Sequence, residues 1–135
     1  MINFEELIKR HEGFSKTLYR CTAGKLTIGY GRNIEDNGIS QDEAELMLSN
    51  DIEEHDVELT KVFPDPMPDS CYAALLDMHF NLGHTKFMQF RKMIAAVKEG
   101  DYEKAAEEML DSAWAKQVPT RAEEDAMLMR GATND

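Results

Sequence analysis

Glycines interrupt a β-prone stretch near the start of this 135-residue chain, whereas the residues on both sides follow helical spacing. Short β-prone pieces separated by glycines are typical of antiparallel strands joined by tight turns. We therefore predict a small antiparallel sheet, followed by a loop over residues 36–38. The β-prone pieces are Leu18-Tyr19, Leu26-Thr27-Ile28 and Tyr30, and the glycines are Gly24, Gly29 and Gly31.

Two helices are predicted to flank this sheet. Asn3, with Glu6 three residues later, has the pattern of a capping box, and the helix that it begins is expected to end at Gly13. Ser40 and Glu43 repeat the capping-box pattern at the start of a longer helix. Its apolar stripe continues to about residue 61, and prolines at positions 64, 66 and 68 then prevent further helix.

The pattern is helical again from residue 69 to near the end of the chain, with a last helix that opens at Pro119 and Thr120. The predicted fold class is therefore α+β, in a single domain over residues 1–135. Within it we expect an N-terminal helix and sheet lobe (1–38), a bridging helix (39–62) and a helical lobe (69–135). Two lobes joined by one helix would leave a cleft in which a polymer can bind.

The net charge of −11 is distributed unevenly along the chain. Residues 1–34 hold six Lys or Arg against three Glu, which gives +3, and residues 35–135 hold nine against 23 acidic residues, which gives −14. The acidic excess argues against nucleic acid as the partner, whereas the basic first quarter is compatible with an anionic polymer. A solvated surface selected for solubility would have the same composition.

Apolar runs are too short for a membrane span, and the first twenty residues lack the apolar centre of a signal peptide. We therefore expect synthesis in a cytoplasm and no stable membrane insertion. Cys21 and Cys71 are far apart and are expected to be free thiols, with Cys71 in the core. No metal site is expected, because neither the cysteines nor the four histidines (His11, His55, His79 and His84) have the spacing of a metal set.

Three side chains near the N-terminus carry the candidate chemistry. Glu12 closes the first helix, Cys21 lies where a strand passes into a turn, and Thr27 lies on the next strand. One short hairpin would bring Cys21 and Thr27 together opposite the helix end. A carboxylic acid facing a small polar pair can protonate a leaving oxygen while a water molecule is held on the other side.

These residues and their surroundings resemble the catalytic motif of bacteriophage-type lysozymes, the endolysins of T-even and lambdoid phages. The similarity extends over nearly the whole chain and includes the start of the bridging helix, a turn near the cleft and a segment with the spacing Trp-x-x-Gln-x-Pro-x-Arg. The matching stretches are Glu12-Gly13, Tyr19, Cys21, Gly24, Thr27-Ile28-Gly29-Tyr30-Gly31, 39–45, Phe80-Asn81-Leu82-Gly83, and Trp114, Gln117, Pro119, Thr120 and Arg121.

The resemblance implies a lysozyme-like fold and assigns roles to several residues. Glu12 is implied as the general acid, and burial would raise its pKa so that it holds a proton near neutral pH. Thr27 is similar to the family residue that helps to hold the attacking water. Arg121 resembles a supporting residue that pairs with the acid, although it would be equally suited to tying the first helix to the last.

Cys21 departs from the better-known members of the family, which have Asp at this position. An ordinary thiol is mostly protonated at pH 7, so Cys21 would carry little charge unless a neighbour such as Arg20 lowered its pKa. We consider first a role in orienting water or acting as a weak base, and last a role as nucleophile. In a further alternative, Cys21 is only a small packed residue and the enzyme is impaired.

The remaining candidate residues also follow from the resemblance. Four residues align with sugar-binding positions of the family: Asn33, Phe80, Met93 and Glu108. Phe80 would also suit the core, and Met93 and Glu108 differ from the small polar residues expected there. Asn81 is a supporting residue of the turn. Arg32 replaces a frequent family His, so any ion pair made by that His would be absent or rebuilt. Trp114 is expected to pack the helical lobe.

The resulting prediction is an endolysin that hydrolyses the β-1,4 bond between N-acetylmuramic acid and N-acetylglucosamine, with no cofactor and no metal. Its partners would be peptidoglycan glycan strands, reached in the periplasm after release, and the protein would be a monomer. A lytic transglycosylase needs only the acid and is one alternative. A catalytically inactive lysozyme fold that binds wall glycan or a protein is the other.

Overall fold

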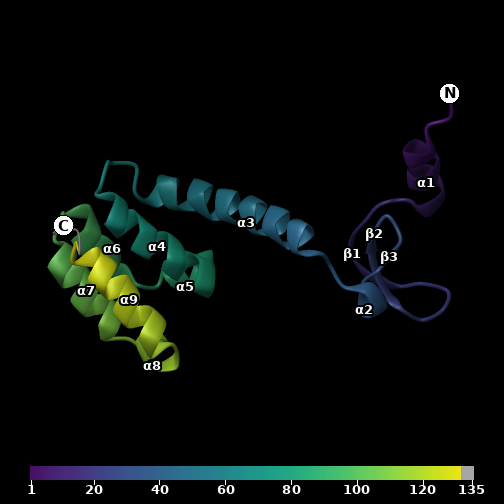
Figure 1. Ribbon diagram of the computed structural model, residues 1–135. Coiled ribbons are helices and arrows are strands. Elements are labelled where there is room, and N and C mark those ends of the chain that lie inside the picture. Colours follow the sequence, from purple (N-terminus) through teal and green to yellow (C-terminus); the bar gives the residue numbers. More distant parts are fainter. Residues whose placement is uncertain (132–135) are drawn as a thin grey trace. The chain divides into compact units, whose positions relative to one another are not determined.

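The computed structural model describes residues 1–131, and residues 132–135 of the predicted helical lobe lie outside the described residues. The chain divides into two compact units, Met1–Met47 and Leu48–Asp135. The division falls inside the long helix α3 (Gln41–Val62). The lobe boundaries at residues 38 and 69 stay predictions. Figure 1 shows the elements of each unit.

The first unit begins with helix α1 (Phe4–Glu12) and continues into strands β1 (Ser15–Arg20), β2 (Leu26–Gly29) and β3 (Arg32–Asn33). The predicted cap of α1 is confirmed, because the Asn3 side chain accepts a hydrogen bond from the Glu6 N–H at 3.1 Å. Gly13 ends the helix with a φ of 71°. The same residue types that mark the helix in the sequence therefore also define its ends.

The three strands form an antiparallel sheet in the order β1-β2-β3, as predicted. Thr27 on the central strand pairs with Tyr19 on one side and with Asn33 on the other. The register of β1 shifts between Ser15 and Tyr19, which is the mark of a bulge or irregularity. Because β2 is paired along both edges, Thr27 occupies the best-supported position of the sheet.

A short helix, α2 (Ile34–Asn37), replaces most of the loop that the sequence suggested over residues 36–38. Its first turn is capped by the side chain of Asn33, which accepts from the Asp36 N–H at 3.1 Å, and Gly38 ends it. A helix of one turn is too short to show hydrophobic periodicity in the sequence. The capping residue Asn33 is the only sequence feature that indicates α2.

Helix α3 starts as the sequence predicts. The Ser40 hydroxyl accepts from the Glu43 N–H at 3.1 Å, and the Glu43 carboxylate accepts from the Ser40 N–H at 2.8 Å. This reciprocal pair is a capping box. The helix continues to Val62, just before the proline-rich segment, in which Pro64 is the first residue that cannot donate a backbone hydrogen bond.

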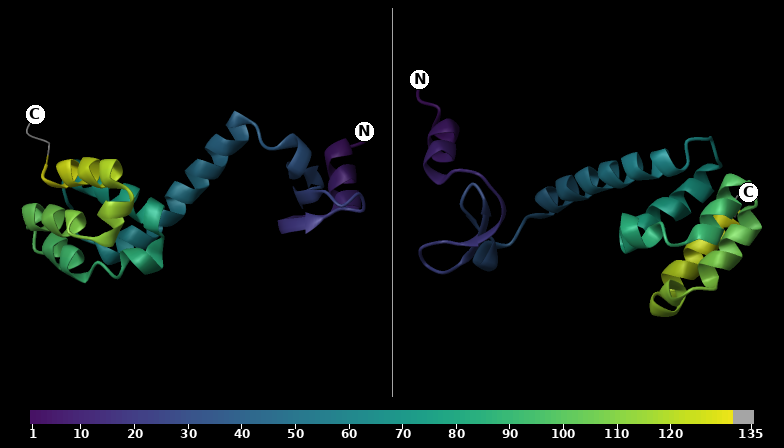
Figure 2. Two further views of the ribbon diagram at one scale, coloured as in Figure 1. Left: turned by 90° about the horizontal axis from the view of Figure 1, so that it is seen from below. Right: turned by 180° about the vertical axis from the view of Figure 1, so that it is seen from behind.

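The second unit is helical over its described residues after α3. Its helices are α4 (Asp69–Leu82), α5 (His84–Phe87), α6 (Arg91–Lys98), α7 (Tyr102–Leu110), α8 (Ala113–Gln117) and α9 (Pro119–Met129). Helix α9 packs on α4 and α7, and α6 packs on α7, as the views of Figure 2 show. The core between them contains the fully buried side chains of Leu75, Met78, Phe87, Met109 and Met129.

The α+β, lysozyme-like fold class predicted from the sequence is confirmed by this combination of a small antiparallel sheet and many helices. In the part of the chain that the structure describes, no helix combines the length and the apolar character needed to cross a membrane.

Candidate active site

Glu12 is the last residue of α1, and the backbone turns sharply after it at Gly13. Its carboxylate lies directly against the backbone of Gly31, at the turn between β2 and β3. A Cβ atom added at Gly31 would lie 2.5 Å from Glu12 Oε2 and 2.8 Å from Glu12 Cδ. The motif glycine therefore leaves the space that the carboxylate occupies. Glu12 was expected to be buried, but the residues of its own unit leave its side chain exposed.

Cys21 lies in the turn between β1 and β2. Its N–H donates to the carbonyl of Lys25 at 3.0 Å, and its own carbonyl accepts from the Gly24 N–H at 2.8 Å, which closes the turn. The thiol is partly exposed and unpaired. Hydrogen bonds from the backbone of Lys25 and Ala23 are the main cause that holds the pKa of Cys21 below its usual value, and the Thr27 side chain lies beside the sulfur.

Within the first unit Cys21 is therefore half-buried rather than fully buried, and its role stays a prediction. The sequence pointed to Arg20 as the group that could lower its pKa, but the hydrogen-bond donors around the sulfur come mainly from the turn itself. Donors that favour the charged form lower a thiol pKa in the same way as a nearby cation.

Thr27 is buried, with 3% of its surface exposed, and points from the central strand toward the turn that holds Cys21. Its hydroxyl donates to the Lys25 carbonyl at 2.9 Å, so its oxygen lone pairs remain available. The structure thus brings Cys21 and Thr27 together, as the hairpin in the sequence predicted, with the hydroxyl fixed by the turn.

Charged side chains support this hairpin from the side of α2. The Glu35 carboxylate accepts from the Leu26 N–H at 3.1 Å and lies 3.8 Å from the Lys25 ammonium. Arg32 forms a two-pronged ion pair with Glu43, in which Nη1 lies 2.9 Å from Oε1. The guanidinium holds the pKa of Glu43 down at about 2. This ion pair joins β3 to the start of α3.

The side chain of Asn33, a predicted sugar contact, is engaged by Asp36 through both of its polar atoms. Its Oδ1 caps α2, and its Nδ2 donates to Asp36 Oδ2 at 2.9 Å. The structure therefore gives Asn33 a local structural role. Sugar binding by Asn33 stays a prediction.

In the second unit, Phe80 and Arg121 line one hollow of about 330 Å³, together with apolar side chains of α3 and α4. Two nitrogens of the Arg121 guanidinium bind the Asp77 carboxylate, with Nε 2.9 Å from Oδ2 and Nη2 2.8 Å from Oδ1. This bidentate pair ties α9 to α4. It lowers the pKa of Asp77, whereas burial and the neighbouring Asp77 raise the pKa of Asp125 to about 8.

The other candidate residues of the second unit have different surroundings. Asn81 accepts from the Trp114 indole N–H at 2.8 Å, and Trp114 is buried, so its predicted packing role is confirmed. Met93 and Glu108 line a common hollow of about 360 Å³. Met93 is only 1% exposed, which leaves almost no side-chain surface for a sugar. Glu108 is half-buried at its rim.

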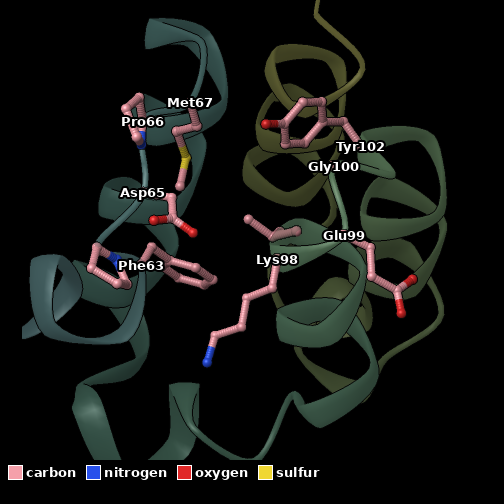
Figure 3. Close-up of a pocket in the computed structure, with 10 residues that line it drawn as sticks. Phe63, Asp65, Pro66, Met67, Lys98, Glu99, Gly100 and Tyr102 are labelled. Carbon is pink, nitrogen blue, oxygen red and sulfur yellow. The ribbon is translucent and has the colours of Figure 1, made fainter.

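A further hollow of about 460 Å³ separates the α3–α4 connection from the end of α6 (Figure 3). Asp65, Lys98 and Tyr102 are among its lining residues. None of the predicted site residues lines it, and the hollow plays no part in the function proposed below.

Three histidines that the sequence treats as unrelated are brought together in the second unit. His55 Nδ1 lies 2.6 Å from His79 Nδ1, and His79 Nε2 lies 2.9 Å from His84 Nδ1. From the sequence alone these histidines were not expected to form a metal set. Their positions on helical faces could have suggested a cluster, but only tertiary packing determines which faces meet.

Comparison with known proteins agrees with this fold and hairpin. The profile of the family described as phage lysozyme matches residues 9–130. A protein named endolysin, from Acyrthosiphon pisum secondary endosymbiont phage 1, is 35% identical over 114 residues, which cover 82% of this chain and 75% of the relative. The chain belongs to the phage lysozyme family.

Proposed function

We propose that this protein is an endolysin that hydrolyses the β-1,4 bond between N-acetylmuramic acid and N-acetylglucosamine in peptidoglycan. The family match and the endolysin relative support an enzyme that lyses the cell wall. The observation that carries the finer proposal is that Thr27 on β2 lies beside Cys21 in the β1–β2 turn, in the same unit as the Glu12 carboxylate.

In this mechanism Glu12, as a carboxylic acid, donates its proton to the glycosidic oxygen, and the bond from that oxygen to the anomeric carbon breaks. The transition state resembles an oxocarbenium ion. A water molecule attacks the opposite face of the anomeric carbon, and the water loses one proton. One product then carries a hydrated reducing end and the other a new hydroxyl group.

Cys21 and Thr27 are proposed to hold this water. The Thr27 oxygen has free lone pairs that can accept from the water, and the lowered pKa of Cys21 increases its thiolate fraction, which can accept the released proton. We rank the water-holding or weak-base role of Cys21 ahead of a nucleophilic role because of the family resemblance. The lowered pKa does not itself separate the two roles, since both use the thiolate.

The proposed substrate is the peptidoglycan glycan strand, which the enzyme would meet as a monomer in the periplasm after its release from the cytoplasm. Residues 1–34, with their net charge of +3, are the proposed face toward this polymer. The resemblance to the family also leads us to propose supporting or sugar-binding roles for six further residues: Asn33, Phe80, Asn81, Met93, Glu108 and Arg121.

The test is clearing of permeabilised Gram-negative cells by the wild type and by Glu12→Gln. We expect the wild type to clear the suspension and the variant to lose clearing. Glu6→Gln, an exposed carboxylate on the same helix, is the matched control and should retain activity. Glycan binding without any clearing by the wild type would instead support the inactive binding module.

Mass spectrometry of the released fragments separates hydrolysis from the transglycosylase alternative. The proposal requires hydrated reducing ends, which incorporate oxygen from labelled water. Anhydro ends without labelled oxygen would overturn the assignment of a water-holding role to Cys21 and Thr27.

A further inference from the structure

Four side chains from three helices converge in the second unit, apart from every residue assigned to catalysis. His55 and Glu58 lie three residues apart on α3, so both are on one face of that helix. His79 is near the end of α4, and His84 is the first residue of α5. One ligand atom from each of His55, Glu58 and His79 lies within 4.8 Å of the other two.

Two of these histidines share a single proton. A neutral imidazole has one N–H donor and one lone-pair acceptor. If His79 Nε2–H donates to His84 Nδ1, then His79 Nδ1 is an acceptor and His55 Nδ1 must donate to it. In the opposite tautomer both directions reverse. In either case one of the two Nδ1 atoms carries the proton and the other accepts it with its lone pair, across a distance of 2.6 Å.

The cluster lies against the core of the second unit, and His79 is fully buried. The rings of Phe80 and Phe87 pack against the cluster, with centroids 5.0 Å from those of His55 and His79 respectively. The Glu58 side chain is 43% exposed and leaves a route from solvent.

We propose that His55 Nδ1, His79 Nδ1 and the Glu58 carboxylate form a binding site for a zinc ion. Two nitrogens and one carboxylate oxygen are a ligand set that Zn²⁺ accepts, with water as the fourth ligand. Tetrahedral nitrogens about 2.05 Å from zinc would be roughly 3.4 Å apart. With His79 Nε2–H donating to His84, the proton between the two Nδ1 atoms moves through solvent to His55 Nε2, so that both rings stay neutral and each Nδ1 lone pair is free for the metal. The Nδ1 atoms then separate by less than about 1 Å.

His84 supports this site by contacting the ligand His79 from behind. It holds His79 Nε2 at 2.9 Å, which fixes the tautomer and the ring orientation when the Nδ1 atom binds the metal. Since the ligands come from α3 and α4, the ion would join these two helices. This site is independent of the proposed function, because Glu12, Cys21 and Thr27 lie in the other unit.

The experiment uses the full chain, stripped of metal by a chelator and titrated with ZnCl₂ by calorimetry at neutral pH. We expect one zinc ion per chain and a higher melting temperature. His55→Ala and Glu58→Gln should each weaken zinc binding at least tenfold, and His84→Ala should weaken it by about tenfold to a hundredfold, as supporting residues usually do. Glu54→Gln, an exposed carboxylate on the same helix, is the matched control and should bind like the wild type.

Cobalt(II) substitution reports the ligand chemistry, because sulfur ligands give an intense charge-transfer band that nitrogen and oxygen ligands do not. We expect a tetrahedral d–d spectrum without that band. The spectrum should be lost in His55→Ala, whose folding is verified by circular dichroism. A sulfur band, no binding by the wild type, or equal zinc affinity in His55→Ala and Glu54→Gln would overturn the proposal.

Discussion

Replacement of Gly31 by Ala separates the position of the Glu12 carboxylate from the stability of the hairpin. The φ of Gly31 is +76°, and an added Cβ would lie 2.5 Å from Glu12 Oε2. Gly29, two residues earlier, has a similar φ of +70°, but an added Cβ there meets nothing within 4 Å. The two glycines therefore have a similar positive φ, and of the two only Gly31 would place an added Cβ against Glu12.

The expected magnitudes follow from these contacts. An Ala residue in left-handed backbone costs about 1–2 kcal/mol, so both variants should lose that much unfolding free energy. At Gly31 the carboxylate must also move, by about 1 Å to restore normal contact. The Glu12 side chain is flexible, so this movement costs little stability. A misplacement of about 1 Å can still cost a hundredfold in rate, or about 2.7 kcal/mol of barrier.

The measurement combines urea unfolding with the initial rate of cell clearing for Gly29→Ala and Gly31→Ala. We expect similar stabilities, with activity reduced about a hundredfold more in Gly31→Ala than in Gly29→Ala. If both variants clear cells at the same rate, the position of the Glu12 carboxylate does not limit the reaction, and the reasoning that makes Glu12 the acid fails.

Three other predictions concern the turn and the two ion-pair clusters. Cys21→Asp should retain activity, whereas Cys21→Ala should lose tenfold to a thousandfold in clearing rate, about 1.4–4 kcal/mol of barrier. Full activity of the Ala variant would remove Cys21 from the mechanism. A trapped sugar–thiol adduct would instead make Cys21 the nucleophile. The folded-state pKa of Asp125 is raised to about 8, so the folded protein binds more protons than the unfolded chain from about pH 4 to 8. The free energy of unfolding therefore falls as pH rises through that window, with a limiting slope of about 1.4 kcal/mol per pH unit. Urea unfolding over this range should show a flatter profile for Asp125→Asn, and an unchanged slope would contradict the assignment. The pKa of Glu43 is lowered to about 2 by Arg32, so the stability that separates the wild type from Glu43→Gln should be present above about pH 4.5 and decline as pH falls toward 2; a difference that is independent of pH would contradict the pair.

Local signals in the sequence predicted the features that depend on neighbouring residues. The Asn3 cap and the Ser40–Glu43 capping box are formed by residues three apart, so the pattern contains both partners. The hairpin that joins Cys21 to Thr27 is equally local, because six positions of chain and a glycine turn determine it. Glycines also mark chain breaks by their residue type alone, so Gly24, Gly29 and Gly31 could be placed between β-prone pieces from the sequence.

Features that depend on packing between distant segments could not be predicted in this way. Asp77 binds Arg121 across 44 positions of the chain, and a surface carboxylate in the sequence resembles any other. His55 and His79 meet across 24 positions for the same reason. Hydrophobic periodicity identifies the buried face of each helix, but the partner of that face is determined by the packing of the whole unit.

The single tryptophan makes the two units separately observable. Trp114 lies buried in the second unit with its N–H held by Asn81, so its fluorescence should report the unfolding of that unit. Cys21 is the partly exposed thiol of the first unit, whereas Cys71 is 1% exposed in the second. Thiol labelling and indole emission, recorded on one sample during denaturation, would therefore follow each half of the molecule by its own signal and reveal whether the halves melt together.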